Sequence, residues 1–156
     1  MKKIYLFISF LAIPVFIGMV KLFLFTDSNE ENFTKGIKAF DTENYNAAII
    51  YFNWVDKKKY PEVIHYLGDS YLKIGDVSNC IQLLQEVYDK KSVNNMNELS
   101  KLVNLLGIAY SKNNDLKQAR FYFLEAKKLG NQNSLRNIQI LDSLEQVQKN
   151  APDINQ

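Results

Sequence analysis

Few residues of this chain have the types and spacing that catalysis or metal binding requires. His65 is the only histidine and Cys80 the only cysteine, so neither has a second residue of its kind to share a zinc ion. No serine or cysteine lies at a useful spacing from His65 to serve as a nucleophile beside it. The acidic residues are scattered without a general acid–base pair, and no glycine-rich phosphate loop is present. The sequence therefore predicts a protein that is not an enzyme and holds no cofactor or metal ion.

Length and charge also narrow the function. The 156 residues are enough for one domain with an anchor or tail, and 47% hydrophobic residues suit a globular fold. With 19 basic and 17 acidic residues, the net charge of +2 gives no strong attraction to nucleic acid. A single cysteine forms no intramolecular disulfide, so packing must hold the domain together. We expect neither a nucleic-acid partner nor a small-molecule substrate.

The first part of the chain has the composition of a membrane segment. Lys2 and Lys3 precede an apolar run over residues 4–25 in which Lys21 is the only charged residue. As a helix this run would measure about 33 Å, enough to cross the hydrocarbon core of a bilayer. We predict a transmembrane anchor over residues 1–26 with its N-terminus in the cytoplasm, because lysines favour that side. The rest of the chain then lies on the far side of the membrane, which is the periplasm if the organism is bacterial.

The alternative for this segment is a cleaved secretory signal peptide, since a positive start and an apolar run fit both. The residues that follow Gly18 include Lys21, Leu22 and Phe23 rather than the small residues of a cleavage site. No cysteine lies nearby, so a bacterial lipoprotein is excluded. An uncleaved anchor is favoured, and the signal peptide stays open.

Beyond a polar linker at residues 27–31, the sequence repeats around its glycines. In the best copy, Gly107 follows Leu106 and precedes Tyr110, Ala119, Phe123 and Ala126 by 3, 12, 16 and 19 residues. The same offsets give Tyr71, Cys80, Leu84 and Val87 after Gly68, and Ala39, Ala48, Phe52 and Val55 after Gly36. This pattern resembles the tetratricopeptide repeat (TPR), in which Leu-Gly-x-x-Tyr is followed by a small, an aromatic and a second small residue. The first copy departs most, with Lys35 and Ala39 in place of the leucine and tyrosine.

The resemblance implies an all-α fold: a TPR helical-hairpin solenoid with a C-terminal capping helix, behind the N-terminal transmembrane helix. The TPR domain would span 32–149, with repeats at about 29–60, 61–94 and 100–131, a capping helix at 134–149 and a tail at 150–156. The helices are predicted at 32–41, 45–58, 61–73, 77–89, 97–112, 116–128 and 134–149. The capping helix has an apolar stripe of Leu135, Ile138, Leu141, Leu144 and Val147.

Two features receive a structural interpretation within this pattern. Cys80 occupies a position that calls for a small buried side chain, and a free cysteine packs well there. Lysines gather at 57–59, 90–91 and 127–128, at the predicted ends of the second helices, where they would interact favourably with the helix dipole. The alternative for the lysines is a ridge that contacts acidic lipid or an acidic partner.

The first helices of TPR domains line a concave face that binds peptides. Positions not needed for packing predict a protein-binding groove of Phe33, Ile37, Phe40, His65, Asp69, Leu72, Lys73, Lys101, Asn104, Ile108 and Lys112. Such a mixed set suits an extended or helical peptide segment with apolar anchors. The alternative is that Phe33, Phe40 and Leu72 pack against a neighbouring helix or the anchor. Phe33 and Ile37 in the first unit, and Leu105 in the third, argue against a clamp for the C-terminal carboxylate of chaperones.

The sequence thus favours a membrane-anchored adaptor that binds other proteins, or an assembly factor for an envelope or membrane complex. The alternative is a permanent structural subunit of a larger membrane protein complex. The resemblance says nothing about which protein is bound.

Overall fold

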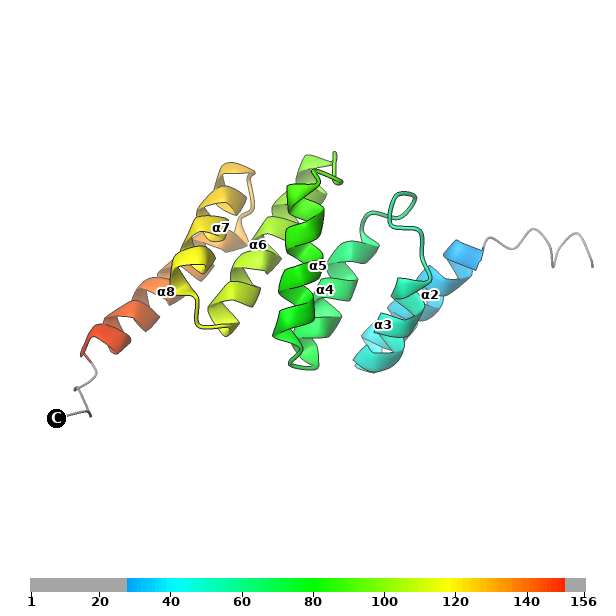
Figure 1. Cartoon of the computed structure of the whole chain (residues 1–156), viewed down its shortest axis with the longest axis horizontal. Helices are drawn as coiled ribbons and strands as arrows, with labels where there is room; N and C mark the ends of the chain where they lie inside the picture. Colours follow the sequence, from blue (N-terminus) through cyan, green and yellow to red (C-terminus); the bar gives the residue numbers. More distant parts are fainter. Residues whose placement is uncertain (1–27, 151–156) are drawn as a thin grey trace, which may run out of the picture.

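In the computed structural model, which describes residues 28–150, the chain forms seven α-helices and no strand in that range (Figure 1). The helices are α2 (Ser28–Asp41), α3 (Tyr45–Asn53), α4 (Val63–Lys73), α5 (Val77–Asp89), α6 (Met96–Lys112), α7 (Leu116–Lys128) and α8 (Asn133–Asn150). None of them is both long and apolar enough to cross a bilayer. The predicted anchor at 1–26 lies outside the described residues.

The helices pack as three successive hairpins, α2–α3, α4–α5 and α6–α7, and α8 packs on the last. Figure 1 shows the first helices of the hairpins in one layer and the second helices in another. In the first layer, α2 contacts α4, α4 contacts α6, and α6 contacts α8. In the second layer, no Cα atom of α5 lies within 8 Å of one in α3 or α7. The row therefore curves with the first helices on its inner, concave side.

In each hairpin, a glycine of the first helix lies directly against a side chain of the second helix. A Cβ atom built on Gly107 would lie 2.6 Å from the ring of Phe123, and one on Gly68 would lie 3.0 Å from Leu84. Gly36 meets Phe52 in the same way. The partner is 16 residues further along in all three hairpins, as the sequence pattern predicts. The residues at offset 12, which are Ala48, Cys80 and Ala119, are fully buried, so this position has the same environment in all three hairpins.

The turn inside each hairpin is also the same. The residue seven positions after the glycine has a left-handed backbone, with φ of 58° at Glu43, 81° at Gly75 and 61° at Asn114. The next residue caps the second helix through a side-chain oxygen that accepts a backbone N–H. These caps are Asn44, Asp76 and Asp115. A left-handed residue followed by an N-cap ends one helix and starts the next within three residues.

The first helix begins earlier than the sequence predicts, at Ser28 rather than at residue 32. Residues 28–31 are therefore not a linker. Glu30 and Glu31 lie in the first turn, where carboxylates interact favourably with the helix dipole, and Glu31 pairs with Lys35 at 2.7 Å.

The second helix ends earlier than predicted, at Asn53 instead of residue 58. Its last turn tightens, because Trp54 and Val55 donate to carbonyls only three residues back. The backbone N–H of Asp56 then leaves the helix and donates to Oδ1 of Asn29 at 2.7 Å. A contact between residues 27 positions apart thus holds the chain just after α3.

The core runs continuously through the three hairpins, with Phe52, Leu67, Leu84 and Leu106 almost fully buried. A smaller cluster of Ala119, Phe123 and Leu141 joins α8 to α7. Arg120 adds ion pairs to Asp142 at 2.5 Å and to Glu145 at 2.7 Å across the same contact.

The prediction of a buried stripe along α8 is only partly right. Leu141 is buried and Ile138 partly buried, but Leu135, Leu144 and Val147 are 46%, 43% and 68% exposed. Among the described helices only α6 and α7 contact α8, so only one side of it is covered. The remaining apolar side of α8 faces solvent.

Candidate functional site

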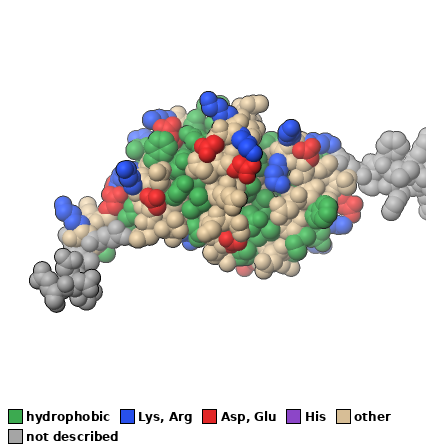
Figure 2. Space-filling model, viewed as in Figure 1, with side chains coloured by type: hydrophobic (Ala, Val, Ile, Leu, Met, Phe, Trp, Pro, Cys, Tyr) green, Lys and Arg blue, Asp and Glu red, His purple; other side chains and the backbone are tan. Residues whose placement is uncertain are grey.

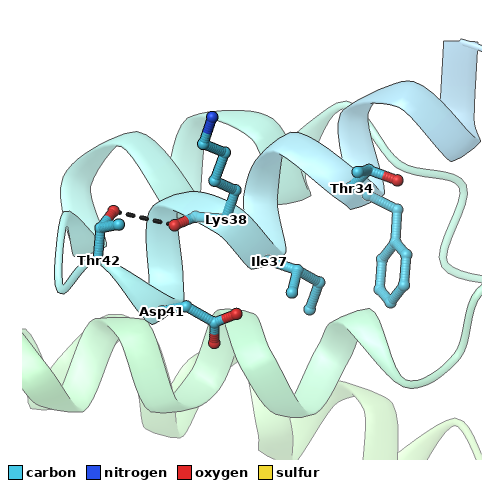
Figure 3. A pocket seen from close by; sticks show the side chains of 6 residues that line it. Thr34, Ile37, Lys38, Asp41 and Thr42 are labelled. Atoms are coloured by element: carbon cyan, nitrogen blue, oxygen red, sulfur yellow. Dashed lines mark hydrogen bonds between the residues drawn. The ribbon is translucent and has the colours of Figure 1, made fainter.

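The inner side of α2 carries a shallow groove of about 440 Å³ (Figure 3). It is lined by Phe33, Thr34, Ile37, Lys38, Asp41 and Thr42. Ile37 and Asp41 project from one side of the helix in Figure 3, and Lys38 projects from the opposite side. The hydroxyl of Thr42 donates to the carbonyl oxygen of Lys38 at 2.9 Å, at the C-terminal end of α2. The groove offers one aliphatic side chain flanked by polar groups.

Phe33 and Phe40, the two phenylalanines of α2, contact aromatic rings of neighbouring elements. Phe33 stacks on Tyr60 with 5.4 Å between ring centroids, and Phe40 meets Tyr66 edge-on at 5.4 Å. Both phenylalanines are partly buried against the core. They therefore pack against neighbouring elements, which is the alternative that the sequence left open, and Phe33 also lines the groove.

The middle of the inner face is polar and lies where α4 faces α6. His65 and Asp69 are one turn apart on α4, and Lys101 on α6 pairs with Glu98 at 2.8 Å. Nδ1 of His65 is buried and has no hydrogen-bond partner among the described residues. Burial lowers the pKa of His65 below its ordinary value, and Lys101 lowers it further, against the opposite effects of Asp69 and Glu98. His65 is therefore neutral at pH 7.

Three predicted groove residues lie at the edges of this polar region. Lys73 and Lys112 are exposed in the last turns of α4 and α6. The Lys73 ammonium lies 6.0 Å from the centre of the Tyr45 ring. Ile108 is partly buried and packs against both core clusters, so only part of its side chain is accessible.

The prediction that Leu72 and Asn104 line the groove is wrong. Leu72 is 7% exposed and belongs to the core, because the inner helices touch one another and cover the side of α4 on which it lies. Asn104 is 9% exposed, and its Oδ1 accepts a hydrogen bond from Nδ2 of Asn137 at 2.8 Å. It joins α6 to α8. Leu105 was one of the residues that argued against a carboxylate clamp. It is also buried, against Gly68, and does not line the inner face.

Several residues that line the inner face are not among those predicted from the sequence. Thr34 and Asp41 lie three and four positions from Ile37, so helical spacing alone could have placed them beside it. Lys38 in turn lies four positions after Thr34. Glu98 likewise lies three positions before Lys101. The position of Asn137 depends on how α8 packs, and no local pattern gives that.

The structure offers no metal site in residues 28–150, where no three His, Cys, Asp or Glu side chains come together. Cys80 is fully buried, and burial raises the pKa of its thiol to about 12, with smaller effects of Asp69 and Asp76. A thiol with that pKa is not a nucleophile at neutral pH. The prediction that Cys80 is a packing residue is confirmed.

Comparisons with known proteins agree with the geometry. Residues 100–133 match the tetratricopeptide-repeat family. No curated protein sequence matches the chain. Among solved structures, the complex of the TPR2AB domain of yeast Sti1 with pHSP90 is similar, with a TM-score of 0.67 at 16% identity. That match covers 78% of this chain and 48% of the Sti1 chain, so this chain spans about half of that neighbour. The described residues therefore have a TPR-like solenoid fold, and their third hairpin matches the TPR family.

Proposed function

We propose that this protein is a membrane-anchored adaptor that holds a peptide segment of another protein in its concave groove. The observation that carries the proposal is the inner face itself. Ile37, His65 and Asp69 remain accessible there, although they lie on helices that are otherwise committed to the core. A surface that combines an aliphatic contact with polar groups along a row of helices suits an extended or helical peptide.

The fold supports this proposal in two ways. All three hairpins share the glycine contact and the turn of the hairpin that matches the TPR family, so we infer that all three are repeats of this family. The similar domain of yeast Sti1 was solved as a complex with pHSP90. At 16% identity this similarity shows the fold alone, and it does not identify the partner of this chain.

The membrane anchor is the second part of the proposal. It rests on the apolar run at 4–25 with lysines before it, which is long enough to span a bilayer. The groove would then be held close to the membrane, where it could retain a partner during assembly of an envelope or membrane complex. An adaptor of this kind binds and releases its partner and does no chemistry.

A permanent structural subunit is the second candidate. The exposed apolar side of α8, with Ile140, Leu144 and Val147, favours it, because such a surface often lies against another chain. In that case α8 would be the main contact, and the inner groove would contribute less.

Photo-crosslinking of the full-length protein in its own membranes tests the proposal. A photoreactive amino acid replaces Thr34 or Lys112 on the inner face, and Gln82 or Lys117 on the second helices serves as the matched control. We expect crosslinks to a partner from the first pair only, and we expect Lys73→Glu to weaken them. Equal crosslinking from all four positions would count against the groove.

The same membranes distinguish the two candidates. Purification in mild detergent should recover the partner in less than equimolar amount if the protein is an adaptor. Recovery of one set of partners at fixed stoichiometry, with crosslinks from Ile140 instead of Thr34, would establish the structural subunit.

A further inference from the structure

The end of the solenoid at which α2 begins has an unusual surface. Trp54, the only tryptophan of the chain, is 72% exposed, and Ile50, one turn before it on α3, is 59% exposed. Figure 2 shows hydrophobic side chains at this end of the molecule. Three lysines at positions 57–59 follow in the loop. We call Ile50, Trp54, Lys57, Lys58 and Lys59 the α2–α3 end surface.

The hydrogen bond from Asp56 to Asn29 fixes where this surface lies. It holds the loop after α3 beside the first turn of α2, and Figure 1 shows the loop and the start of α2 at the same end of the hairpin. The preceding part of the chain, residues 1–27, therefore joins the domain next to the loop that contains the three lysines.

The helix dipole does not account for these lysines. Lys127 and Lys128 lie in the last turn of α7, and Lys90 directly follows α5 and pairs with Glu86 at 2.5 Å. By contrast, α3 ends at Asn53, and the dipole acts only within the last turn of a helix. Lysines 57–59 lie beyond it.

We infer that the α2–α3 end surface lies against the headgroups of the membrane that carries the chain. The inference rests on the proposed anchor. Only two residues lie between Phe25, the last residue of the apolar run, and Ser28. The three steps from Phe25 to Ser28 span at most about 10 Å. The headgroup layer on each side of a bilayer is about 5–7 Å thick. The start of α2 must then lie at the membrane surface, together with the loop hydrogen-bonded to it.

The side chains fit that environment. Tryptophan is enriched where hydrocarbon meets headgroups, and lysine near the surface is attracted to anionic lipids. Two of the acidic side chains at this end are engaged within the protein: Glu31 pairs with Lys35, and the Asp56 carboxylate accepts the backbone N–H of Lys58. Glu30, in the first turn of α2, is exposed. Insertion of Trp54 is therefore the main contact, and anionic lipid strengthens it. With α2 and α3 at the membrane, the row of helices extends away from it and α8 lies farthest out.

The single tryptophan makes the inference measurable in the full-length chain. The protein is reconstituted into vesicles of phosphatidylcholine and phosphatidylglycerol, with or without bromine atoms on the acyl chains. We expect Trp54 emission to be blue-shifted and to lose intensity in the brominated vesicles. The double variant W54F/F121W moves the tryptophan to an exposed position on α7, and it should show neither effect. The triple variant K57Q/K58Q/K59Q should reduce the quenching, and more so in vesicles that contain phosphatidylglycerol.

Flotation of the vesicles after carbonate treatment separates the possible failures. If the chain does not float, the anchor fails and this inference is overturned with it, while the peptide groove is unaffected. If the chain floats but the emission of Trp54 is the same in both kinds of vesicle, the surface contact is wrong and the anchor stands. Equal quenching at positions 54 and 121 would also overturn it, because the domain would then lie flat on the membrane.

Discussion

Gly107 lies directly against the ring of Phe123, which is itself 3% exposed. A Cβ atom at position 107 would come within 2.6 Å of two ring carbons, so this buried ring would have to shift. We therefore expect Gly107→Trp to unfold the domain, and Ala119→Trp, at another fully buried position, to do the same. Even modest overpacking of a core costs about 1–3 kcal/mol.

Thermal unfolding of the full-length protein in detergent, followed by circular dichroism, measures this effect. Lys112→Trp is the matched control, because it places the same ring on the exposed end of the same helix. A normal unfolding temperature for Gly107→Trp would mean that the glycine contact is not where the structure has it.

Leu72 gives a prediction opposite to the one that helical spacing suggests. Spacing places it in the groove, where Leu72→Glu would reduce binding and leave the fold intact. Because Leu72 is 7% exposed within the core, a buried carboxylate there should instead unfold the domain. Leu72→Ala should cost about 2–4 kcal/mol in urea denaturation. Lys73→Glu, on the exposed neighbour, should leave the unfolding midpoint nearly unchanged; equal effects of the Leu72 and Lys73 variants would refute the burial.

Gly107 and Leu72 show what the sequence can and cannot predict. The contact of Gly107 with Phe123, and the turns at Glu43, Gly75 and Asn114, recur at fixed offsets, so a comparison of the copies finds them. Both depend on interactions within one hairpin. The hairpins and most helix ends could therefore be predicted from local patterns.

The errors concern contacts between hairpins. The chain after α3 is held by Asn29, which is 27 residues from Asp56, and Asn104 is hydrogen-bonded to Asn137 of α8. The candidate groove was predicted only in part for the same reason. Helical spacing shows which residues share a face, but not how closely the next inner helix covers that face.

The turn between α2 and α3 offers a stabilising substitution. Glu43 has a φ of 58°, where Gly75 stands in the second hairpin. A left-handed backbone is unfavourable for a residue with a Cβ atom and costs nothing for glycine. We expect Glu43→Gly to raise the free energy of unfolding by about 0.5–1 kcal/mol. Gln82→Gly, at an exposed position in the middle of α5, should lower it by about 1 kcal/mol. Urea denaturation of both variants checks the opposite signs.

Cys80 should be chemically silent in the folded protein. Its thiol is fully buried, and burial raises its pKa to about 12. A thiol reagent at pH 8 should therefore label the protein only after urea unfolds it. The raised pKa also stabilises the folded state below pH 9, the ordinary value, and this contribution is lost as the pH rises from 9 towards 12.

Cys80→Ala is the matched variant for that experiment. Alanine stands at the equivalent positions 48 and 119, so the variant should fold and lose part of the destabilisation at high pH. Rapid labelling of the native protein would contradict the burial of this side chain.

His65 provides the last test, since the chain has one histidine and therefore one imidazole resonance in NMR. Burial, with a smaller effect of Lys101, holds its pKa below the ordinary value of 6.5. The unfolded chain then binds a proton before the folded one as the pH falls. Stability is full above pH 6.5 and declines as the pH falls through the pKa of the folded state. We expect a titration midpoint below 6.5, and we expect His65→Gln to remove this part of the acid sensitivity. A midpoint above 6.5 would show that the imidazolium is stabilised by Asp69 and Glu98, and the inner face would then present a positive charge to its ligand.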